Sequence, residues 1–466
     1  MNGKHITKLG FTNKSIGLAL AAAQLREDAG LSRQAILDEL SAVKAQPAAY
    51  QASEYAALVS ELLAQQAHTD LHAQDALRPA ARPYAQFGGH LIEQSAHDQM
   101  NVAMRLPIAR AGALMPDAHV GYGLPIGGVL ATENAIIPYG VGVDIGCAMR
   151  LSVFAVPAER LKTPEALALL QKHTRFGAGV GFERRERLGH AVLDEAAWDE
   201  QPILRRLHDK AAEQIGTSGS GNHFAEFGSF TLDAPEAGLA TGTYLALLSH
   251  SGSRGFGAQV AGHFTKLAES LHPTLDASAR KLAWLDLGSE AGEAYWQAMN
   301  LAGRYALANH EQLHARLSRA LGEVPALSAW NSHNLAWKEM VNGEERIVHR
   351  KGATPAARGQ LGLIPGSMAD PGYLVRGKGH APALGSASHG AGRQLGRKAA
   401  QAALSKSAVS AYLRERGVTL IGGGIDEAPQ AYKRIEAVIA AQTELVEVLG
   451  EFRPRVVRMD SGSEDI

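Results

Sequence analysis

The chain has one cysteine, Cys147, among its 466 residues. An internal disulfide is therefore excluded, and the composition fits a reducing compartment. No apolar run approaches the roughly eighteen residues that a membrane span requires. The first apolar run, residues 16–25, is short and is followed by charged residues instead of a cleavage site, so we expect no signal peptide. These shortages predict a cytoplasmic protein without a membrane partner.

An excess of charge of one sign is also missing. Lysine and arginine number 46, aspartate and glutamate 47, and the net charge is −1. No global basic field indicates nucleic-acid binding, so any site for a polyanion must be a local patch. Glycine, in contrast, is abundant at 50 residues. This abundance predicts many turns or close approaches of the backbone to a ligand.

The hydrophobic pattern divides the chain into a small helical part and a larger mixed part. Residues 1–80 are rich in alanine, and Ser32 precedes apolar residues at helical spacing, so we expect a helical N-terminal appendage with a scaffolding role. Residues 81–460 are expected to form one larger domain, and residues 461–466 a polar tail. Within the larger part we expect a strand at residues 244–248 and helices over three segments: residues 91–106, most of 257–321, and 426–452.

The central stretch, residues 115–149, is too rich in glycine for a helix interior. Its apolar pieces, residues 128–130, 135–138 and 141–145, predict short strands joined by tight turns. The last of these turns carries Asp144 and Cys147, and a carboxylate and a thiol this close can share a metal ion. The alternative is that Cys147 is a small buried hydrophobic residue, which is the usual role of a lone cysteine.

Three of the 19 histidines share a more specific context. His223, His250 and His333 each lie at a turn bearing glycine, serine or asparagine, beside an apolar segment. With Asp144 and Cys147 they offer three nitrogens, one oxygen and one sulfur, which suits Zn²⁺, Mn²⁺, Fe²⁺ or Co²⁺ better than Ca²⁺ or Mg²⁺. Five such ligands are enough for a two-metal site in which the sulfur bridges. The alternative is that they are ordinary surface or core histidines.

The segment HGAGR, residues 389–393, is the second chemical feature. Its glycines let the backbone approach an anion, a helix is expected to follow, and Arg393 adds positive charge. A histidine at the mouth of such a loop can attack phosphorus as a nucleophile. The alternative is a glycine turn with an incidental histidine. The basic cluster at Arg184–Arg187 is expected in a loop that contacts phosphates; a solvated face is the alternative.

Taken together, these segments resemble the RtcB-type RNA ligase family, the tRNA-splicing and RNA-repair ligases. The matching pieces run in the family's order over roughly residues 90–459: MPDAHVGYGLPIGG, VGVDIGC, GNHFAEF, HSGSRG, HN at 333–334, RKGA, IPGSM, SHGAGR and DEAPQAYKRIEAV. The resemblance implies an α+β fold in which short strands line a metal cleft and helices lie outside. The N-terminal 80 residues lie outside it.

The resemblance also implies an activity. A ligase of this type depends on GTP and two Mn²⁺ ions, and it joins an RNA 3′-phosphate or 2′,3′-cyclic phosphate to a 5′-hydroxyl through a histidine–GMP intermediate. By motif match His389 is the nucleophile, and the metal ligands are Asp144, Cys147 (bridging), His223, His250 and His333; Asp117 matches a position near the metals. The family often depends on the small protein archease, and the resemblance implies that RNA reaches the cleft across basic loops near Arg184–Arg187, Arg350 and Lys351, and Arg376 and Lys378. The residues that match the guanine nucleotide pocket are Asn222, His223, Phe224, Glu226, His333, Asn334, Pro365, Gly366, Ser367, Met368, Gly390, Ala391, Gly392 and Tyr432.

Two positions depart from the family pattern. Asp460 stands where the family has a C-terminal lysine that contacts the nucleotide, and Gly372 stands where a serine is usual. A shifted tail would place Arg455 or Arg458 where the lysine acts. Both departures concern recognition of GTP, while the expected metal ligands and nucleophile are intact. They leave two alternatives open: an RNA-end nucleotidyl transferase with altered nucleotide use or poor sealing, and a non-catalytic RNA-binding relative.

Overall fold

The computed structural model describes residues 1–461, and its chain contacts separate two compact units, Met1–Ala76 and a larger unit that begins at Leu77. The sequence predicted the boundary at residue 80. The polar tail expected at residues 461–466 lies, except for Ser461, outside the described residues.

The smaller unit is helical and has its own core. Ser32 caps α3 by accepting a hydrogen bond from the amide of Ala35. Apolar residues of α3 such as Ile36 and Leu40 are buried in one cluster with Leu58 and Val59 of α4. Its helices are α1 (Gly3–Lys8), α2 (Lys14–Asp28), α3 (Arg33–Ala45) and α4 (Ala56–Asp75).

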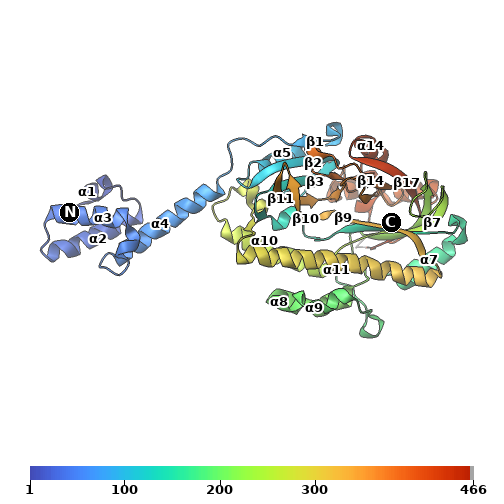
Figure 1. The fold of residues 1–466 in the computed structure, drawn as a ribbon, viewed down its shortest axis with the longest axis horizontal. Coiled ribbons are helices and arrows are strands. Elements are labelled where there is room, and N and C mark those ends of the chain that lie inside the picture. The colour runs from blue at the N-terminus through green and yellow to red at the C-terminus, as the bar shows by residue number, and fades with distance from the viewer. Residues whose placement is uncertain (462–466) are drawn as a thin grey trace. The chain divides into compact units, whose positions relative to one another are not determined.

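The larger unit is an α+β body built on two main sheets (Figure 1). The larger sheet has the strand order β13-β14-β17-β6-β7-β5-β9, and β16 pairs with β17. Its strands are β5 (Ala148–Phe154), β6 (Phe224–Leu232), β7 (Gly242–Ser251), β9 (Pro325–Ser332), β13 (Leu361–Ile364), β14 (Gly372–Gly377), β16 (Thr419–Ile421) and β17 (Val446–Met459).

The smaller sheet has the order β1-β2-β3-β11-β10. The chain passes from the larger sheet to the smaller one at His333, which stands between β9 and β10. The strands are β1 (Ala85–Gln86), β2 (Ala109–His119), β3 (Ile126–Thr132), β10 (Asn334–Val341) and β11 (Glu344–Lys351). Two short ribbons pair β4 (Ala135–Ile136) with β8 (Leu285–Asp286), and β12 (Ala353–Pro355) with β15 (Ser386–Ser388).

Helices cover the sheets from outside, as expected. The longest, α11 (Glu290–Leu321), runs along the length of the larger unit in Figure 1. Ser289 caps its first turn, and Gly322 ends it in a left-handed conformation with φ of 77°. Other helices are α5 (Gln94–Met104), α6 (Pro138–Val141), α7 (Thr163–His173), α8 (Ala197–Glu200), α9 (Pro202–Gln214), α10 (Arg254–Leu271), α12 (Arg397–Ala403), α13 (Lys406–Glu415) and α14 (Ile435–Ala440).

The two faces of the larger sheet bury different cores. On β7, Leu245 and Leu247 lie in a cluster with Leu313 and Leu317 of α11. Leu248, on the other face, lies in a cluster with residues of β5, β9 and β17. Because successive side chains of a strand alternate between faces, each strand presents one set of residues to α11 and another to the opposite side. The functional groups lie on that opposite side.

Two predicted elements are wrong. Residues 141–145 were predicted as a strand, but Val141 ends α6 and residues 142–145 form a bend that begins with Gly142 at φ of 102°. Residues 426–452, predicted as one helix, form two short 3₁₀ turns, the helix α14 and the first half of β17. The predicted helices at 91–106 and within 257–321 and the strand at 244–248 are confirmed by α5, α10, α11 and β7.

Candidate metal centre and nucleotide cavity

Three neighbouring strands bring Cys147, His250 and His333 to one place. Cys147 precedes β5, His250 is near the end of β7, and His333 follows β9. β5 pairs with both of the other strands, and Met149 lies opposite His250 on one side and Asn331 on the other. The alternation of side chains then directs these residues to the face opposite α11.

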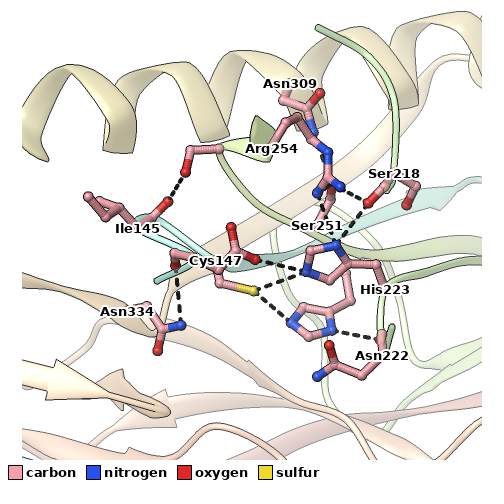
Figure 2. A network of polar contacts seen from close by, with 12 residues as sticks. Ile145, Cys147, Ser218, Asn222, His223, Ser251, Arg254, Asn309 and Asn334 are labelled. Atoms are coloured by element: carbon pink, nitrogen blue, oxygen red, sulfur yellow. Dashed lines mark hydrogen bonds and ion pairs between the residues drawn. The ribbon is translucent and has the colours of Figure 1, made fainter. Parts of the chain in front are cut away.

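The donor atoms of this group converge. The Sγ of Cys147 lies 3.1 Å from the Nε2 of His250 and 3.4 Å from the Nε2 of His223. The two Nε2 atoms of His250 and His333 are 3.3 Å apart. A carboxylate oxygen of Asp144 lies 3.0 Å from the Nε2 of His223. Figure 2 shows Cys147 directed toward His223 and the neighbouring imidazole. All five predicted metal ligands are therefore in one cluster.

The hydrogen bonds of the imidazole rings show which ring nitrogens present a lone pair to the cluster. His250 places its Nδ1 3.0 Å from the carbonyl oxygen of Asn222, which can only accept, so the Nε2 carries a lone pair. The Nδ1 of His223 lies 2.9 Å from the Ser218 carbonyl and 3.0 Å from the guanidinium of Arg254, and its Nε2 faces the Asp144 carboxylate. Several electron-pair donors therefore face one another at close range. A cation between them removes the repulsion, which is the situation of a metal centre.

Electrostatics agree with this assignment. Burial lowers the pKa of His250 and of His333 well below 6.5, so both rings are neutral at pH 7, as metal ligands must be. Burial also raises the pKa of the Cys147 thiol, and the Asp144 carboxylate raises it further. Asp144 itself stays ionised: burial opposes this, but the hydrogen bond and charge of His223 hold its pKa below the ordinary range. A bound divalent cation reverses the tendency of the thiol to stay protonated.

A buried polar chain lies behind these ligands, on the side of α11. The Ser152 hydroxyl donates to the Nδ1 of His314, the Nε2 of His314 donates to the Ser249 oxygen, and the Ser249 hydroxyl donates to the Nδ1 of His310, each at 2.8 Å. His310 ends the chain by donating to the carbonyl of Ser251. The side chains of Asn309 and Arg254 reach the same serine, as Figure 2 shows. These hydrogen bonds fix the strands that carry the predicted metal ligands from the side that faces α11.

A cavity of about 800 Å³ opens beside the donor cluster. His250 and His389 are among its lining residues. The residues predicted for the nucleotide that line it are Asn222, Phe224, Pro365, Gly366, Ser367, Met368, Gly390, Ala391, Gly392 and Tyr432. The other four, His223, Glu226, His333 and Asn334, are not among its lining residues. Asn334 accepts a hydrogen bond from Gly352 and donates to the carbonyl of Asp144, so it braces the ligand turn.

Glu226 lies within β6 and is 4% exposed. Burial raises the pKa of its carboxyl well above 4.5, and its Oε2 has no hydrogen-bond partner among the described residues. Such a buried acceptor requires a partner to offset its desolvation.

His389 is held by a carboxylate. Its backbone amide and its Nδ1 both donate to the same oxygen of Asp117, at 3.0 and 2.6 Å. Asp117 is fully buried, which by itself raises its pKa, yet His389 and Lys433 hold that pKa below 3.8. Lys433 also pins the backbone on both sides of Asp117 by donating to the carbonyls of Pro116 and Ala118. The ring of His389 lies 5.0 Å from that of His333, between centroids, so it stands next to the donor cluster. Asp117 thus contacts His389 and makes no direct contact with the donor cluster.

The loop after His389 approaches other backbone closely. Gly392 has φ of 71°, and a Cβ there would lie 2.1 Å from the carbonyl oxygen of Asp117, so only glycine fits. Arg393 then pairs with Glu427 at 3.0 Å and covers the ring of Tyr432. The helix expected directly after the loop, α12, begins only at Arg397. Arg393, Arg397 and Lys398 all line the cavity, and each side chain carries a positive charge.

The departures from the family pattern have definite places. Gly372 begins β14, where an added Cβ would meet Pro365 at an ordinary 3.4 Å. The backbone oxygen of Asp460 accepts from Gly423. Arg455 donates to the carbonyl of Ala158, and Arg458 donates to carbonyls at the end of α7. Neither arginine lines the cavity, so the hypothesis that one replaces the lysine is not supported.

Two of the residues predicted to contact RNA from exposed loops are buried, so the prediction is wrong for them. Arg350 and Lys351 lie in β11 and are 1% and 7% exposed. Arg350 pairs with Glu339, and Lys351 donates to the carbonyl of Tyr122. Burial lowers the pKa of Lys351 to about 7. Arg184 and Arg185 are exposed, as expected.

Sequence reasoning missed several residues of the site: Lys433, the polar chain behind the ligands, and the pair of Glu427 and Arg393. A signal existed for the chain, because His310 and His314 lie four residues apart on an otherwise apolar face of α11.

The fold and the site define an α+β protein in which a cluster of side chains that could hold a metal ion lies beside a cavity. A family model described as tRNA-splicing ligase RtcB matches residues 98–199 and 168–460. The RNA-splicing ligase RtcB of Escherichia coli (strain K12) is 34% identical over 399 residues, which cover 78% of this chain and 93% of that protein. The tRNA-splicing ligase RtcB of Thermococcus kodakarensis is 31% identical over 458 residues, which cover 81% of this chain and 94% of that protein. The chain therefore belongs to the RtcB family, a family of enzymes.

Among residues 1–461, no helix has the length and apolar character needed to cross a membrane.

Proposed function

We propose that the protein is a GTP- and Mn²⁺-dependent RNA ligase that joins an RNA 3′-phosphate, or a 2′,3′-cyclic phosphate after hydrolysis, to a 5′-hydroxyl. RNA-splicing ligase is the printed activity of its relatives. The observation that carries the proposal is the place of His389, which is oriented by Asp117 and stands beside the cluster of metal donors.

His389 acts as the nucleophile in this proposal. Because its Nδ1 donates to Asp117, its Nε2 carries the lone pair. Attack on the α-phosphorus of GTP forms an N–P bond and breaks the bond to pyrophosphate, which leaves. An oxygen of the RNA 3′-phosphate then attacks the same phosphorus, which breaks the N–P bond and caps the RNA with GMP. Finally the 5′-hydroxyl attacks the RNA phosphate, and GMP leaves.

The capping step has a chemical reason. A 3′-phosphate monoester has no good leaving group, so a hydroxyl cannot readily displace anything from it. The phosphoanhydride made with GMP supplies that leaving group. Asp117 stabilises the positive charge that develops on the imidazole during attack, and Arg393 and Arg397 offer positive charge to phosphate oxygens in the cavity.

The metal would be held by Asp144, Cys147, His223, His250 and His333. A divalent cation held by these residues would supply positive charge to phosphate oxygens and would polarise phosphorus. The facing lone pairs of the cluster support metal binding. The choice of Mn²⁺ rests on the family resemblance, because this donor set also suits Zn²⁺ and Co²⁺.

The test is transfer of label from each of four α-labelled NTPs to the protein in the presence of Mn²⁺, with sealing of RNA ends measured in parallel. We expect an acid-labile adduct from GTP that is absent in His389→Ala. Sealing by His389→Ala would overturn the nucleophile assignment. An adduct without sealing would favour the nucleotidyl transferase alternative. No adduct from any NTP would favour a non-catalytic relative or a requirement for archease.

A further inference from the structure

Tyr122 is an exposed aromatic residue at the edge of the cavity. It lies in the loop between β2 and β3, it lines the cavity, and its side chain is 72% exposed. Val120, in the same loop, is 45% exposed and also lines the cavity. Exposing a large aromatic ring to water costs free energy unless another group covers it.

The backbone beneath this ring is fixed from several sides. Glu93 accepts from the amide of Val120 at 3.1 Å, and Gln99 accepts from the amide of Gly121 at 3.0 Å while donating to the Gly121 carbonyl. Lys351 donates to the carbonyl of Tyr122 itself. Side chains at the start of α5 and in β11 therefore hold the backbone of a loop from which Val120 and Tyr122 point outward.

The loop also packs tightly at its tip. Gly123 has φ of 73°, and a Cβ there would lie 2.9 Å from the carbonyl oxygen of Lys281. A glycine is required for this contact. The exposure of Tyr122 is therefore a property of an ordered loop, and a ligand that binds the ring does not have to order its backbone.

The surroundings of the ring are aromatic and cationic. Tyr139 lies edge-on to Tyr122, with 6.3 Å between centroids. The ammonium groups of Lys351 and Lys281 lie 5.0 and 5.5 Å from the centre of the Tyr139 ring, and Lys281 also pairs with Glu269. On the cavity side, Lys398 adds positive charge, and Arg393 and Arg397 lie there paired with Glu427.

We propose that Tyr122 is a stacking platform for an unpaired nucleobase of the RNA whose end enters the cavity. This inference rests on the proposed function. Aromatic rings beside positive charge are the recurrent means of binding single-stranded nucleic acid, because every base has a π face and the backbone is anionic. Stacking tolerates any sequence, which suits an enzyme that acts on RNA ends. The base belongs to either the 5′-hydroxyl strand or the 3′-phosphate strand.

The test uses short single-stranded RNAs that carry 2-aminopurine at the terminal nucleotide, one with a 5′-hydroxyl and one with a 3′-phosphate at that end. Fluorescence titration gives the Kd for the wild-type protein and its variants. We expect Tyr122→Ala to raise the Kd of at least one RNA about tenfold and to relieve the stacking-induced quenching. Tyr122→Phe keeps the ring and should bind like the wild type. Trp330→Ala removes an exposed aromatic that does not line the cavity and should change nothing.

The outcomes separate this inference from the proposed function. The strand whose Kd changes is the one that stacks on Tyr122. An RNA with an abasic terminal nucleotide should bind Tyr122→Ala and wild type equally. Equal Kd values for wild type and Tyr122→Ala with both 2-aminopurine RNAs would overturn the stacking platform, even if GTP labels His389. Tyr122-dependent binding without any adduct, even with archease added, would instead uphold the platform and reject the ligase mechanism.

Discussion

Asp117 determines which nitrogen of His389 is free to react. Asparagine keeps the shape of this side chain but removes its charge, and it can present its NH₂ group to the Nδ1 and so stabilise the wrong tautomer. We expect Asp117→Asn to slow formation of the nucleotide adduct by roughly 10²- to 10⁴-fold, the range that such a loss has in comparable dyads. The measurement is the single-turnover rate of labelling with α-labelled GTP.

Two controls make the Asp117 prediction specific. Metal content of Asp117→Asn should equal that of the wild type, since Asp117 contacts His389 and not the donor cluster. Asp98→Asn changes a carboxylate on α5 that pairs with Gln94, and it should label at the wild-type rate. A wild-type labelling rate in Asp117→Asn would show that the carboxylate does not orient the nucleophile.

Cys147 offers a direct spectroscopic test of the metal centre, because it is the only thiol of the chain. Cobalt bound to sulfur gives a charge-transfer absorption band, which here has a single source. We expect the band in Co²⁺-loaded wild type and its loss in Cys147→Ala. Because burial raises the thiol pKa, metal must displace a proton, so affinity should rise with pH, by up to about tenfold per unit. Unchanged Co²⁺ affinity in Cys147→Ala would exclude the thiolate as a ligand.

The residues that sequence could find are those whose local context is chemical. Cys147, His250 and His333 lie at turns beside apolar runs, and the period of two along a strand places them on one face. The contact of His389 with Asp117 joins residues 272 positions apart, and it depends on how β15 and β2 are brought together. No spacing in the sequence encodes a contact between residues so far apart. The sequence could therefore place Asp117 near the metal site, but it could not identify His389 as the partner of Asp117.

At the level of elements, α11 and the strands β5 and β7 share a buried polar seam. His314 accepts from Ser152 and donates to Ser249, and burial lowers its pKa well below 6.5. His314→Ala leaves both hydroxyls without this partner and creates a cavity. We expect the free energy of unfolding to fall by about 2–4 kcal/mol. Urea unfolding followed by tryptophan fluorescence measures it.

The control for this seam lies on the same helix. Arg319 is exposed, and Arg319→Ala should change stability by less than about 0.5 kcal/mol. If His314→Ala were equally neutral, the hydrogen-bonded chain would not stabilise the contact between α11 and the sheet.

The wrong helix prediction at 426–452 has a physical cause at this scale. Its residues include many helix formers, but tertiary pairing outweighs that local preference. β17 bonds to β14 on one side and β6 on the other, so it is a central strand. Gln442 is fully buried and accepts from the amide of Ser388, which fixes the chain where it leaves α14. Composition alone cannot show that β14 and β6 lie in position to pair with these residues.

For the whole molecule, the family resemblance implied the class of fold, while composition and periodicity predicted the separation of a helical N-terminal part. The order of strands in the sheets could not be predicted, since it depends on pairings between distant segments. The five tryptophans, residues 198, 284, 296, 330 and 337, all lie in the larger unit. Their fluorescence therefore reports on that unit separately from residues 1–76.

The larger unit should be sensitive to acid because it folds around neutral histidines. Burial lowers the pKa of His310 to about 3 and those of His119 and His349 to about 4. An unfolded histidine has a pKa near 6.5, so the unfolded chain binds protons first as the pH falls. Each histidine thus contributes stability that is fully present above pH 6.5 and is lost as the pH falls toward its folded pKa.

His349 isolates this effect away from the donor cluster. Its Nε2 accepts from the amide of Ile137, and its Nδ1 donates to the carbonyl of Leu130, so protonation removes an acceptor that the fold uses. Its contribution, about 3 kcal/mol in full, should fall by about 2 kcal/mol between pH 7 and pH 5. We expect His349→Gln to be less stable than wild type at pH 7 but to lose less stability on going to pH 5. Urea unfolding at both pH values, followed by tryptophan fluorescence, measures the loss in the free energy of unfolding for the wild type and for the variant. Parallel losses in wild type and variant would mean that His349 is not held neutral in the folded protein.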